Sequence, residues 1–231
     1  MKLNYGIIGT GMMGCEHIRN LKKIPDVKIV AIADPDERSR KWAEDTCEDA
    51  FKLKLYEDYR ELLTQEDIDV VVVASPNFTH IEIMRELFKT DKHVLLEKPM
   101  CTNLLDAMEV LEKSKKHKGV VWVGLEYRFM SPIQSLINHV NEIGNIKMLS
   151  IREHRFPFLE KVDNWNRFNE KTGGTLVEKC CHFFDLIGLG INLAAFLGIE
   201  SKAYWSIKRI LSAAGFLPST IGCFSCRSLV E

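Results

Sequence analysis

The first 124 residues alternate between short apolar runs and longer amphipathic stretches. The apolar runs predict strands at residues 3–8, 27–33, 53–56, 69–74, 93–96 and 120–124. The run at 69–74, Asp-Val-Val-Val-Val-Ala, is β-branched without polar alternation, which is typical of a strand buried on both faces of a parallel sheet. Helices are predicted between the runs, at residues 15–23, 37–47, 59–63, 79–90 and 104–116. This alternation predicts an α/β fold, with an N-terminal Rossmann domain and its doubly wound parallel sheet over residues 1–124.

The pattern changes after residue 124, and we expect a second domain over residues 125–231. A helix is predicted at 132–142 and a strand at 146–155, and Gly173-Gly174 opens a further helix. Beyond about residue 187 no run of alternating strands follows, so we expect an incomplete α+β domain and suspect a shortened or alternative product of a longer gene. Its unpaired strand edges argue against a homo-oligomer built on that sheet, without excluding one.

Charge and hydropathy narrow the class of partner. Lys and Arg total 31 and Asp and Glu total 32, so the net charge is −1. No basic face for nucleic acid or an anionic membrane is indicated, and we expect a small-molecule partner. The apolar stretch from Phe183 to Ile199 contains Asp185 and Asn192. It falls short of a membrane span of about 20 residues and is expected to be a core helix.

The seven cysteines are an odd set, scattered along the chain rather than arranged as a disulfide framework. This usage favours a reducing compartment, and we expect a cytoplasmic protein. Cys223 and Cys226 form a C-x-x-C pair. Since no second pair or nearby histidine completes a zinc shell, we expect no metal.

A glycine motif lies between the first predicted strand and the first helix. Gly9, Gly11 and Gly14 have the G-x-G-x-x-G spacing, and Asp34 ends the second predicted strand, 20 residues after Gly14. Gly9 permits a tight turn, Gly11 lets the backbone approach a pyrophosphate, and Gly14 allows the helix to pack closely on the strand. In this strand–turn–helix context the motif predicts a dinucleotide site.

Further motifs follow the glycine motif in a fixed order. The set is GIIGTGMMG at 6–14, ADPD at 33–36, SPNFTH at 75–80, EKPM at 97–100 and GGTLVEKCCHFFDL at 173–186. Together they resemble the Gfo/Idh/MocA family of NAD(P)-dependent oxidoreductases, named for glucose-fructose oxidoreductase and inositol dehydrogenase. The resemblance covers residues 3 to about 186. It implies hydride transfer between a nicotinamide cofactor and a sugar, cyclitol or related polyhydroxy substrate.

The resemblance also implies roles for individual residues. Those on the cofactor side are Gly9, Thr10, Gly11, Met12, Met13 and Gly14 at the pyrophosphate, Asp34 at the adenosine ribose, Ser75, Asn77 and His80 at the nicotinamide-side ribose and phosphate, and Glu97, Lys98 and Arg128. Those implied in catalysis are Lys98, Glu178 and His182. Glu178 departs from the aspartate of the family's D-x-x-x-H motif; it keeps the charge and adds a methylene, so its carboxylate is shifted.

The residue types also suit this chemistry when the family resemblance is set aside. Oxidation of a hydroxyl requires a base within hydrogen-bond reach, and Lys98 can accept that proton. Glu178 and His182 are four residues apart, so on one helix they share a face, with Asp185 three residues further on. Asp34 favours NAD because its carboxylate repels a 2′-phosphate, while Arg38 and Arg40 leave NADP as an alternative.

Several of these candidate residues also have a purely structural interpretation. Lys98 can be a surface lysine, His182 a helix histidine, and His80 a hydrogen-bond partner of the turn at 75–79. Arg128 can form an interdomain salt bridge rather than grip a substrate, and Trp165 can pack rather than cap a pocket. Two function classes therefore remain: an active NAD(P)-dependent dehydrogenase, and a cofactor-binding form that is catalytically impaired because its substrate domain is incomplete.

Overall fold

A computed structural model describes residues 2–47, 53–139, 142, 150–153 and 161–196. The chain forms two compact units, one of residues 1–126 with 155–182 and the other of residues 127–154 with 183–231. Segment 155–182, which we expected in the second domain, therefore belongs to the unit that contains the first 126 residues. We call these the Rossmann unit and the second unit.

The Rossmann unit contains a parallel sheet of six strands in the order β3-β2-β1-β4-β5-β6. The strands are β1 Leu3–Ile8, β2 Val27–Ala33, β3 Lys54–Tyr56, β4 Val70–Val73, β5 His93–Leu96 and β6 Val121–Val123. The register pairs Ile8 with both Ala33 and Val73, and continues from Val73 through Leu96 to Val123. The residues that follow these strand ends therefore meet at one edge of the sheet, its carboxyl edge.

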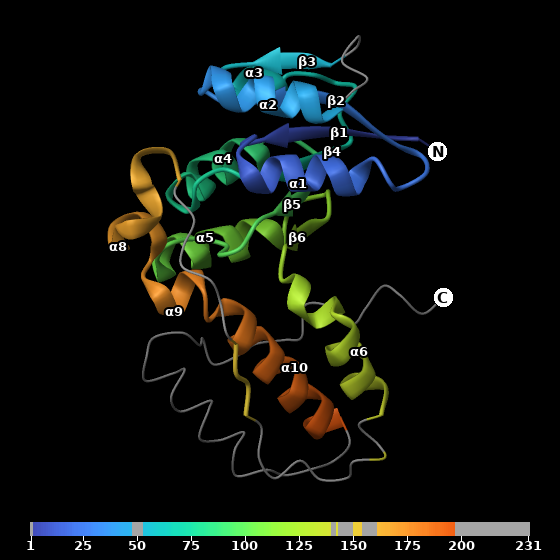
Figure 1. The fold of residues 1–231 in the computed structure, drawn as a ribbon, viewed down its shortest axis with the longest axis vertical. Coiled ribbons are helices and arrows are strands. Elements are labelled where there is room, and N and C mark those ends of the chain that lie inside the picture. Colours follow the sequence, from blue (N-terminus) through green and yellow to red (C-terminus); the bar gives the residue numbers. More distant parts are fainter. Residues whose placement is uncertain (1, 48–52, 140–141, 143–149, 154–160, 197–231) are drawn as a thin grey trace. The chain divides into compact units, whose positions relative to one another are not determined.

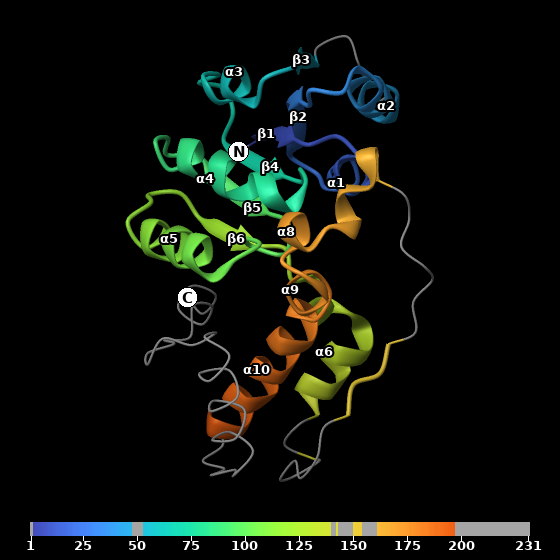
Figure 2. The ribbon, with the colours of Figure 1, turned by 90° about the vertical axis from the view of Figure 1, so that its left-hand side faces the viewer.

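Helices cover both faces of the sheet (Figure 2). They are α1 Met12–Leu21, α2 Glu37–Cys47, α3 Tyr59–Leu63, α4 His80–Leu87 and α5 Leu104–Ser114. Buried side chains of α1 and α2 pack with Val72, whereas those of α3, α4 and α5 pack with Val71 and Val73. Successive residues of β4 thus point into opposite cores, which confirms the prediction that this strand is buried on both faces.

The later segment of the Rossmann unit contains the 3-10 helix η4 Val162–Arg167 and the short helices α8 Asn169–Thr172 and α9 Thr175–Glu178. Trp165 packs edge-on against Phe78 of the 3-10 helix η2 Asn77–Thr79, with 6.3 Å between ring centroids. Gly173 has a φ of 79°, and a Cβ there would lie 2.5 Å from the main-chain oxygen of Thr102. These contacts hold α8 and α9 beside the carboxyl edge of the sheet (Figure 1).

The expectation that one helix carries both Glu178 and His182 is wrong. Helix α9 ends at Glu178, and a new helix, α10 Cys181–Phe196, begins after a two-residue turn. The amides of Lys179 and Cys180 both donate to the main-chain oxygen of Thr175, at 2.9 and 3.2 Å. The bond from Cys180 spans five residues, which widens the helix at this point and ends it. Sequence spacing alone does not reveal this break.

The second unit contains α6 Ser131–Asn138 and most of α10, which run alongside one another in both ribbon views (Figures 1 and 2). Tyr127 packs edge-on against Phe183, and its hydroxyl donates to Glu153 at 2.5 Å. Residues 150–153 of the predicted strand 146–155 form no strand, and the remainder lies outside the described residues. Within the described ranges no strand follows β6. Cys223 and Cys226 also lie outside them.

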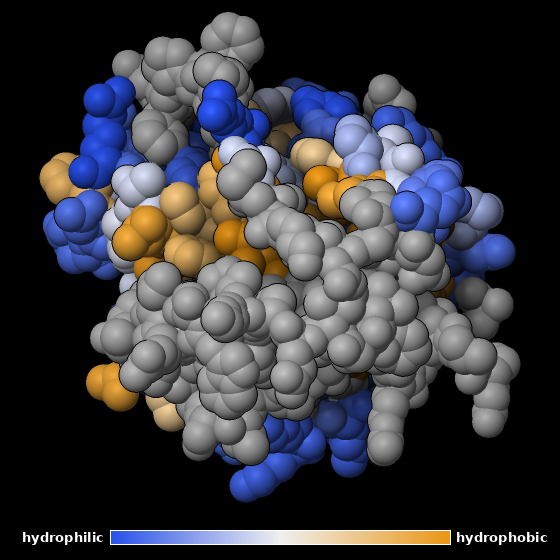
Figure 3. Space-filling view, turned by 90° about the horizontal axis from the view of Figure 1, so that it is seen from below, coloured by the Kyte–Doolittle hydropathy of each residue, from blue (hydrophilic) through white to orange (hydrophobic). Residues whose placement is uncertain are grey.

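Several large apolar side chains are exposed near the β6 end of the sheet. Leu105 of α5 is 80% exposed, and Val120 and Trp122 at β6 are 58% and 40% exposed. Figure 3 shows one face of the molecule, where hydrophobic residues in orange lie beside hydrophilic residues in blue. Among the described residues, no helix has both the length and the apolar character needed to cross a membrane.

Candidate functional site

The glycine loop has the geometry expected of a dinucleotide site. Gly9 has a φ of 86°, and a Cβ there would lie 2.4 Å from the amide nitrogen of Ser75. A Cβ on Gly14 would lie 2.1 Å from the main-chain oxygen of Gly9, whereas one on Gly11 would meet nothing within 4 Å. The first and third glycines therefore allow close packing inside the protein, and the middle one leaves open space at the loop.

The open space adjoins the amino-terminal end of α1. Gly11 is the N-cap, no side chain caps this end, and its first turn contains no acidic residue. Unbonded amides at a helix N-terminus attract phosphate. Met12 and Met13, 38% and 37% exposed, lie in that first turn, while the Thr10 side chain is buried. The loop thus fits a pyrophosphate through its main chain, with the Thr10 side chain turned inward.

Asp34 lies at the same edge, directly after β2. One carboxylate oxygen accepts the Thr10 amide at 2.7 Å and the other accepts the Asp36 amide at 2.9 Å. Asp34 therefore ties the glycine loop to the end of β2. Since a carboxylate oxygen accepts more than one hydrogen bond, Asp34 retains acceptor capacity for ribose hydroxyls.

Ser75, Asn77 and His80 follow β4 at this edge. The Ser75 hydroxyl accepts a hydrogen bond from Thr79 at 2.7 Å. Asn77 is 7% exposed, and its side-chain amide nitrogen has no hydrogen-bond partner in the described protein. A buried donor without an acceptor is unfavourable, so this amide suits a ligand oxygen brought close to it.

His80 is fully buried, and main-chain oxygens engage both of its ring nitrogens. Its Nδ1 lies 2.9 Å from the main-chain oxygen of Pro99, and its Nε2 lies 3.1 Å from that of Ser75. His80 thus bridges the loops after β4 and β5. Burial lowers its pKa, and this effect outweighs the two carbonyl groups, which favour the charged form. We therefore interpret His80 as positioning the two loops rather than touching the cofactor.

The buried His80 gives a pH-dependent contribution to stability. Because its pKa is lowered on folding, the unfolded chain takes up a proton that the folded protein does not, as pH falls below about 6.5. The free energy of unfolding should fall by up to about 1.4 kcal/mol per pH unit from this group. Urea denaturation should show a steeper loss toward acid for the wild type than for His80→Asn. Equal slopes in the two proteins would contradict this account.

Glu97 and Lys98 follow β5. Glu97 is 9% exposed, and its carboxylate lies 2.7 Å from Nε2 of His17 on α1, while its second oxygen accepts the Lys98 amide at 3.2 Å. Burial on its own would raise the Glu97 pKa, but His17 and Lys98 outweigh it and hold the pKa below its usual value. His17 was not among our expected site residues. It lies three residues after Gly14 on α1, the helix that begins at the glycine loop.

Lys98 lies next to the α9 segment of the same unit. Its Nζ donates to the main-chain oxygen of Glu178 at 3.4 Å. The Glu178 carboxylate lies 3.1 Å from Nζ of Lys179, and the side chain is 12% exposed. His182 is 1% exposed, with Nε2 3.7 Å from the Glu126 carboxylate. The structure therefore places the Lys98 ammonium against the main chain of Glu178, and His182 in the first turn of α10, which follows.

Arg128 has a different environment from the cofactor-side residues. It lies in the second unit, where its guanidinium forms a two-pronged ion pair with Asp185 of α10, the Nε donating at 3.0 Å. Asp185 is thus a structural partner within that unit. In the described part of the chain, no group of three or more metal-binding side chains lies together.

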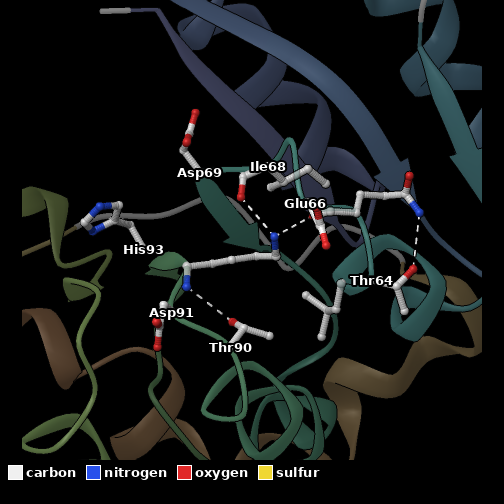
Figure 4. Close-up of a pocket in the computed structure, with 10 residues that line it drawn as sticks. Thr64, Glu66, Ile68, Asp69, Thr90, Asp91 and His93 are labelled. Carbon is white, nitrogen blue, oxygen red and sulfur yellow. Dashed lines mark hydrogen bonds between the residues drawn. The ribbon is translucent and has the colours of Figure 1, made fainter.

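A pocket lies at the opposite edge of the sheet, where β4 and β5 begin. Figure 4 shows Thr64, Glu66, Asp69, Asp91 and His93 around it. Lys92, which also lines it, donates from Nζ to the main-chain oxygens of Gln65 and Ile68 at 2.6 and 3.0 Å. Because parallel α/β sheets bind ligands at their carboxyl edge, we assign this pocket a structural role.

Family models match two parts of the chain. Residues 3–125 match the Gfo/Idh/MocA model, described as an oxidoreductase family with an NAD-binding Rossmann fold. Residues 136–189 match the model of the C-terminal alpha/beta domain of the same family. The first match confirms the predicted Rossmann domain and its cofactor class.

Individual relatives agree with these matches. The myo-inositol 2-dehydrogenase of Thermotoga maritima is 32% identical over 187 residues, which cover 80% of this chain and 53% of that protein. A crystal structure of a probable dehydrogenase from Thermotoga maritima has a TM-score of 0.66 at 30% identity, covering 80% of this chain and 54% of the other. The myo-inositol dehydrogenase from Lactobacillus casei, crystallised with NAD(H) and myo-inositol, has a TM-score of 0.56 at 32% identity, covering 62% and 42%. The chain spans about half the length of the curated relatives it matches.

Proposed function

Since the chain belongs to the Gfo/Idh/MocA family of oxidoreductases, we propose that it is a dehydrogenase that uses NAD to oxidise a hydroxyl of a sugar, cyclitol or related polyhydroxy compound. The observation that carries this proposal is the position of Lys98. It follows β5 at the carboxyl edge, the edge that also contains the glycine loop, and its Nζ contacts the α9 segment. The cyclitol class is favoured by the myo-inositol in the related Lactobacillus casei structure.

The chain's own residues supply cofactor binding. The main chain from Gly9 to Met13 would hold the pyrophosphate, Asp34 the adenosine ribose, and Ser75 and Asn77 the nicotinamide-side ribose. When bound, NAD accepts the hydride that leaves the substrate carbon. Glu97, paired with His17 and bonded to the Lys98 amide, holds the loop that presents Lys98.

Proton transfer is the step that the protein performs. In its neutral form Lys98 accepts the hydroxyl proton at Nζ as the hydride departs, and it returns the proton to the carbonyl in the reverse direction. His182 is proposed to orient the reacting hydroxyl through its ring. Glu178 would accept a hydrogen bond from a neighbouring hydroxyl, so the two side chains fix which carbon faces the cofactor.

The surroundings of Asp34 favour NAD over NADP. The Asp34 carboxylate would repel a 2′-phosphate, and Arg40 is already engaged. Its guanidinium donates to the main-chain oxygens of Asp34 and Pro35 at 2.6 and 3.0 Å, and contacts Glu57 at 3.0 Å. Arg38, whose side chain is 86% exposed, is paired with Asp36. Neither arginine is therefore positioned in advance for a phosphate.

A panel of polyhydroxy compounds tests the proposed reaction and its cofactor together. The full chain is incubated with each compound and either NAD or NADP, and the absorbance of the reduced nicotinamide is followed. We expect turnover with at least one compound, and a kcat/KM for NAD at least about tenfold above that for NADP. A clear preference for NADP would reject the argument from Asp34 and Arg40.

A second function is favoured by a separate observation. The chain spans about half the length of its curated relatives, and among the described residues no strand follows β6. If the described residues include no second sheet that closes a substrate pocket, the chain would hold the cofactor without orienting a substrate. NAD binding by calorimetry, combined with no turnover across the panel, would support this cofactor-binding form over the dehydrogenase.

A further inference from the structure

The loop that carries Lys98 is held on both sides by histidine rings. Before Lys98, the Glu97 carboxylate lies 2.7 Å from Nε2 of His17. After it, the main-chain oxygen of Pro99 lies 2.9 Å from Nδ1 of His80. All of these residues belong to the Rossmann unit. The two histidines therefore tie the residues on either side of Lys98 to helices α1 and α4.

Both oxygens of the Glu97 carboxylate are engaged. One faces Nε2 of His17, and the other accepts the Lys98 amide at 3.2 Å. Although burial favours the neutral acid, His17 and Lys98 outweigh it and hold the Glu97 pKa below its usual value. The carboxylate is therefore an acceptor only, so Nε2 of His17 must carry a hydrogen and donate it. With one oxygen held in this way, the carboxylate is oriented so that its second oxygen meets the Lys98 amide.

The helix that carries His17 packs closely at the glycine loop. His17 lies three residues after Gly14, so the two share one face of α1. A Cβ at Gly14 would lie 2.1 Å from the main-chain oxygen of Gly9, so the helix leaves no room for one there. Ile18, the residue after His17, is fully buried. His17 therefore extends from a backbone with little freedom, and the packing of α1 sets where its ring meets Glu97.

Stability alone is a poor explanation for the pair of His17 and Glu97. Their side chains are 19% and 11% exposed, so both polar groups lose most of their contact with water. Desolvation offsets much of the attraction within such a pair, and apolar side chains of similar size often stabilise a fold equally well. Apolar side chains cannot hold a carboxylate oxygen against the Lys98 amide. The arrangement therefore points to a role at Lys98.

We propose that His17 is a positioning residue: by orienting the Glu97 carboxylate, it fixes the main chain at Lys98 and thereby the place of the Lys98 ammonium. The effect of this positioning on proton transfer rests on the proposed dehydrogenase function, whereas the positioning itself does not. His17 touches neither the substrate nor the reacting atoms in this scheme. Because a displacement of about 1 Å can cost about a hundredfold in rate, loss of a hydrogen bond one residue from Lys98 has a measurable effect.

Amide hydrogen exchange at Lys98 tests the positioning without any substrate. The full chain is labelled with ¹⁵N-lysine, and the Lys98 signal is identified by its loss in Lys98→Met. We expect this amide to exchange at least about fivefold faster in His17→Leu, because the carboxylate that accepts it is no longer oriented. His17→Gln keeps an N–H donor at similar reach and should stay within about twofold of the wild type.

A second variant covers the case in which His17→Leu does not fold. The side chain of His17→Asn is polar but too short to reach the Glu97 carboxylate, so it should show the same faster exchange at Lys98. Exchange at the wild-type rate in the folded variant that lacks the contact would overturn the proposal.

Turnover tests the consequence for proton transfer, on a compound that the wild type oxidises. We expect kcat to fall at least about tenfold in His17→Leu, with a KM for NAD within about threefold of the wild type, because the glycine loop is unchanged. His17→Gln should recover most of kcat. In a Glu97→Ala background, His17→Leu should lower kcat by less than about a further twofold, because His17 acts only through that carboxylate.

His117→Leu is the matched control. Nε2 of His117 lies 2.8 Å from the main-chain oxygen of Lys92, which precedes β5 at the opposite edge of the sheet. The replacement removes a histidine hydrogen bond without touching the carboxyl edge, so Lys98 exchange and kcat should both match the wild type. An equal loss of kcat in His117→Leu and His17→Leu would indicate a general effect on stability and reject the positioning role.

The outcomes also separate this inference from the proposed function. No turnover by the wild type, combined with faster Lys98 exchange in His17→Leu, rejects the dehydrogenase and leaves the positioning of Lys98 in place. Equal kcat in the wild type and His17→Leu supports the dehydrogenase and rejects His17 as a positioning residue.

Discussion

Replacing Lys98 by methionine is expected to lower turnover by about two to four orders of magnitude, because the proton-transfer group is lost while a side chain of similar length remains. NAD affinity should stay within a few-fold of the wild type. The glycine loop does not depend on the Lys98 side chain, and the Glu97–His17 pair that holds the β5 loop is untouched. Turnover is followed by nicotinamide absorbance and NAD binding by calorimetry.

Lys118→Met is the matched control for Lys98→Met. Lys118 is 78% exposed at the side chain and is paired with the exposed Asp91. It should retain full activity, so any loss in Lys98→Met is specific to the site. A Lys98→Met protein with near-normal kcat on a compound that the wild type oxidises would remove lysine from the mechanism.

Alanine at Gly14 and alanine at Gly11 are both expected to weaken NAD binding, but only the first is expected to destabilise the fold. At Gly14 the new Cβ would lie 2.1 Å from the Gly9 main-chain oxygen, and backbone on both sides prevents easy relief. We expect a loss of about 3 kcal/mol in the free energy of unfolding, and weaker NAD binding because α1 must move away from the loop.

Gly11→Ala should fold as well as the wild type. Its φ of −68° suits any residue, and a Cβ there meets nothing within 4 Å. Removing a glycine even stabilises a protein by about 0.4–1 kcal/mol when the conformation is compatible. The same Cβ would occupy the space through which a pyrophosphate approaches, so NAD affinity should fall by about tenfold or more. Urea denaturation and NAD titration check both variants, and unchanged NAD affinity in Gly11→Ala would place the pyrophosphate elsewhere.

Much of the fold was predictable because its signals are local. The β-branched run before Ser75 and the glycine motif each specify an element through neighbouring residues, and the observed strands begin and end within about one residue of the predicted ranges. The family and its cofactor class were likewise predictable, because short motifs in a fixed order indicate them. The family matches over residues 3–125 and 136–189 confirm this prediction. The individual site residues remain predictions for the experiments above.

Within the first 124 residues the sequence by itself determined which segments become strands and helices and which motifs lie at the carboxyl ends of the strands. Only the tertiary structure decided the strand order, the burial of His80 between two loops, and the pairing of Glu97 with a histidine 80 residues away. It also decided that a helix ends between Glu178 and His182 and that Lys98 lies against the main chain of Glu178. Apart from the helix end, these features depend on contacts between segments far apart in the chain. Local propensity contains no information about such contacts, because their energies arise only when packing brings the segments together.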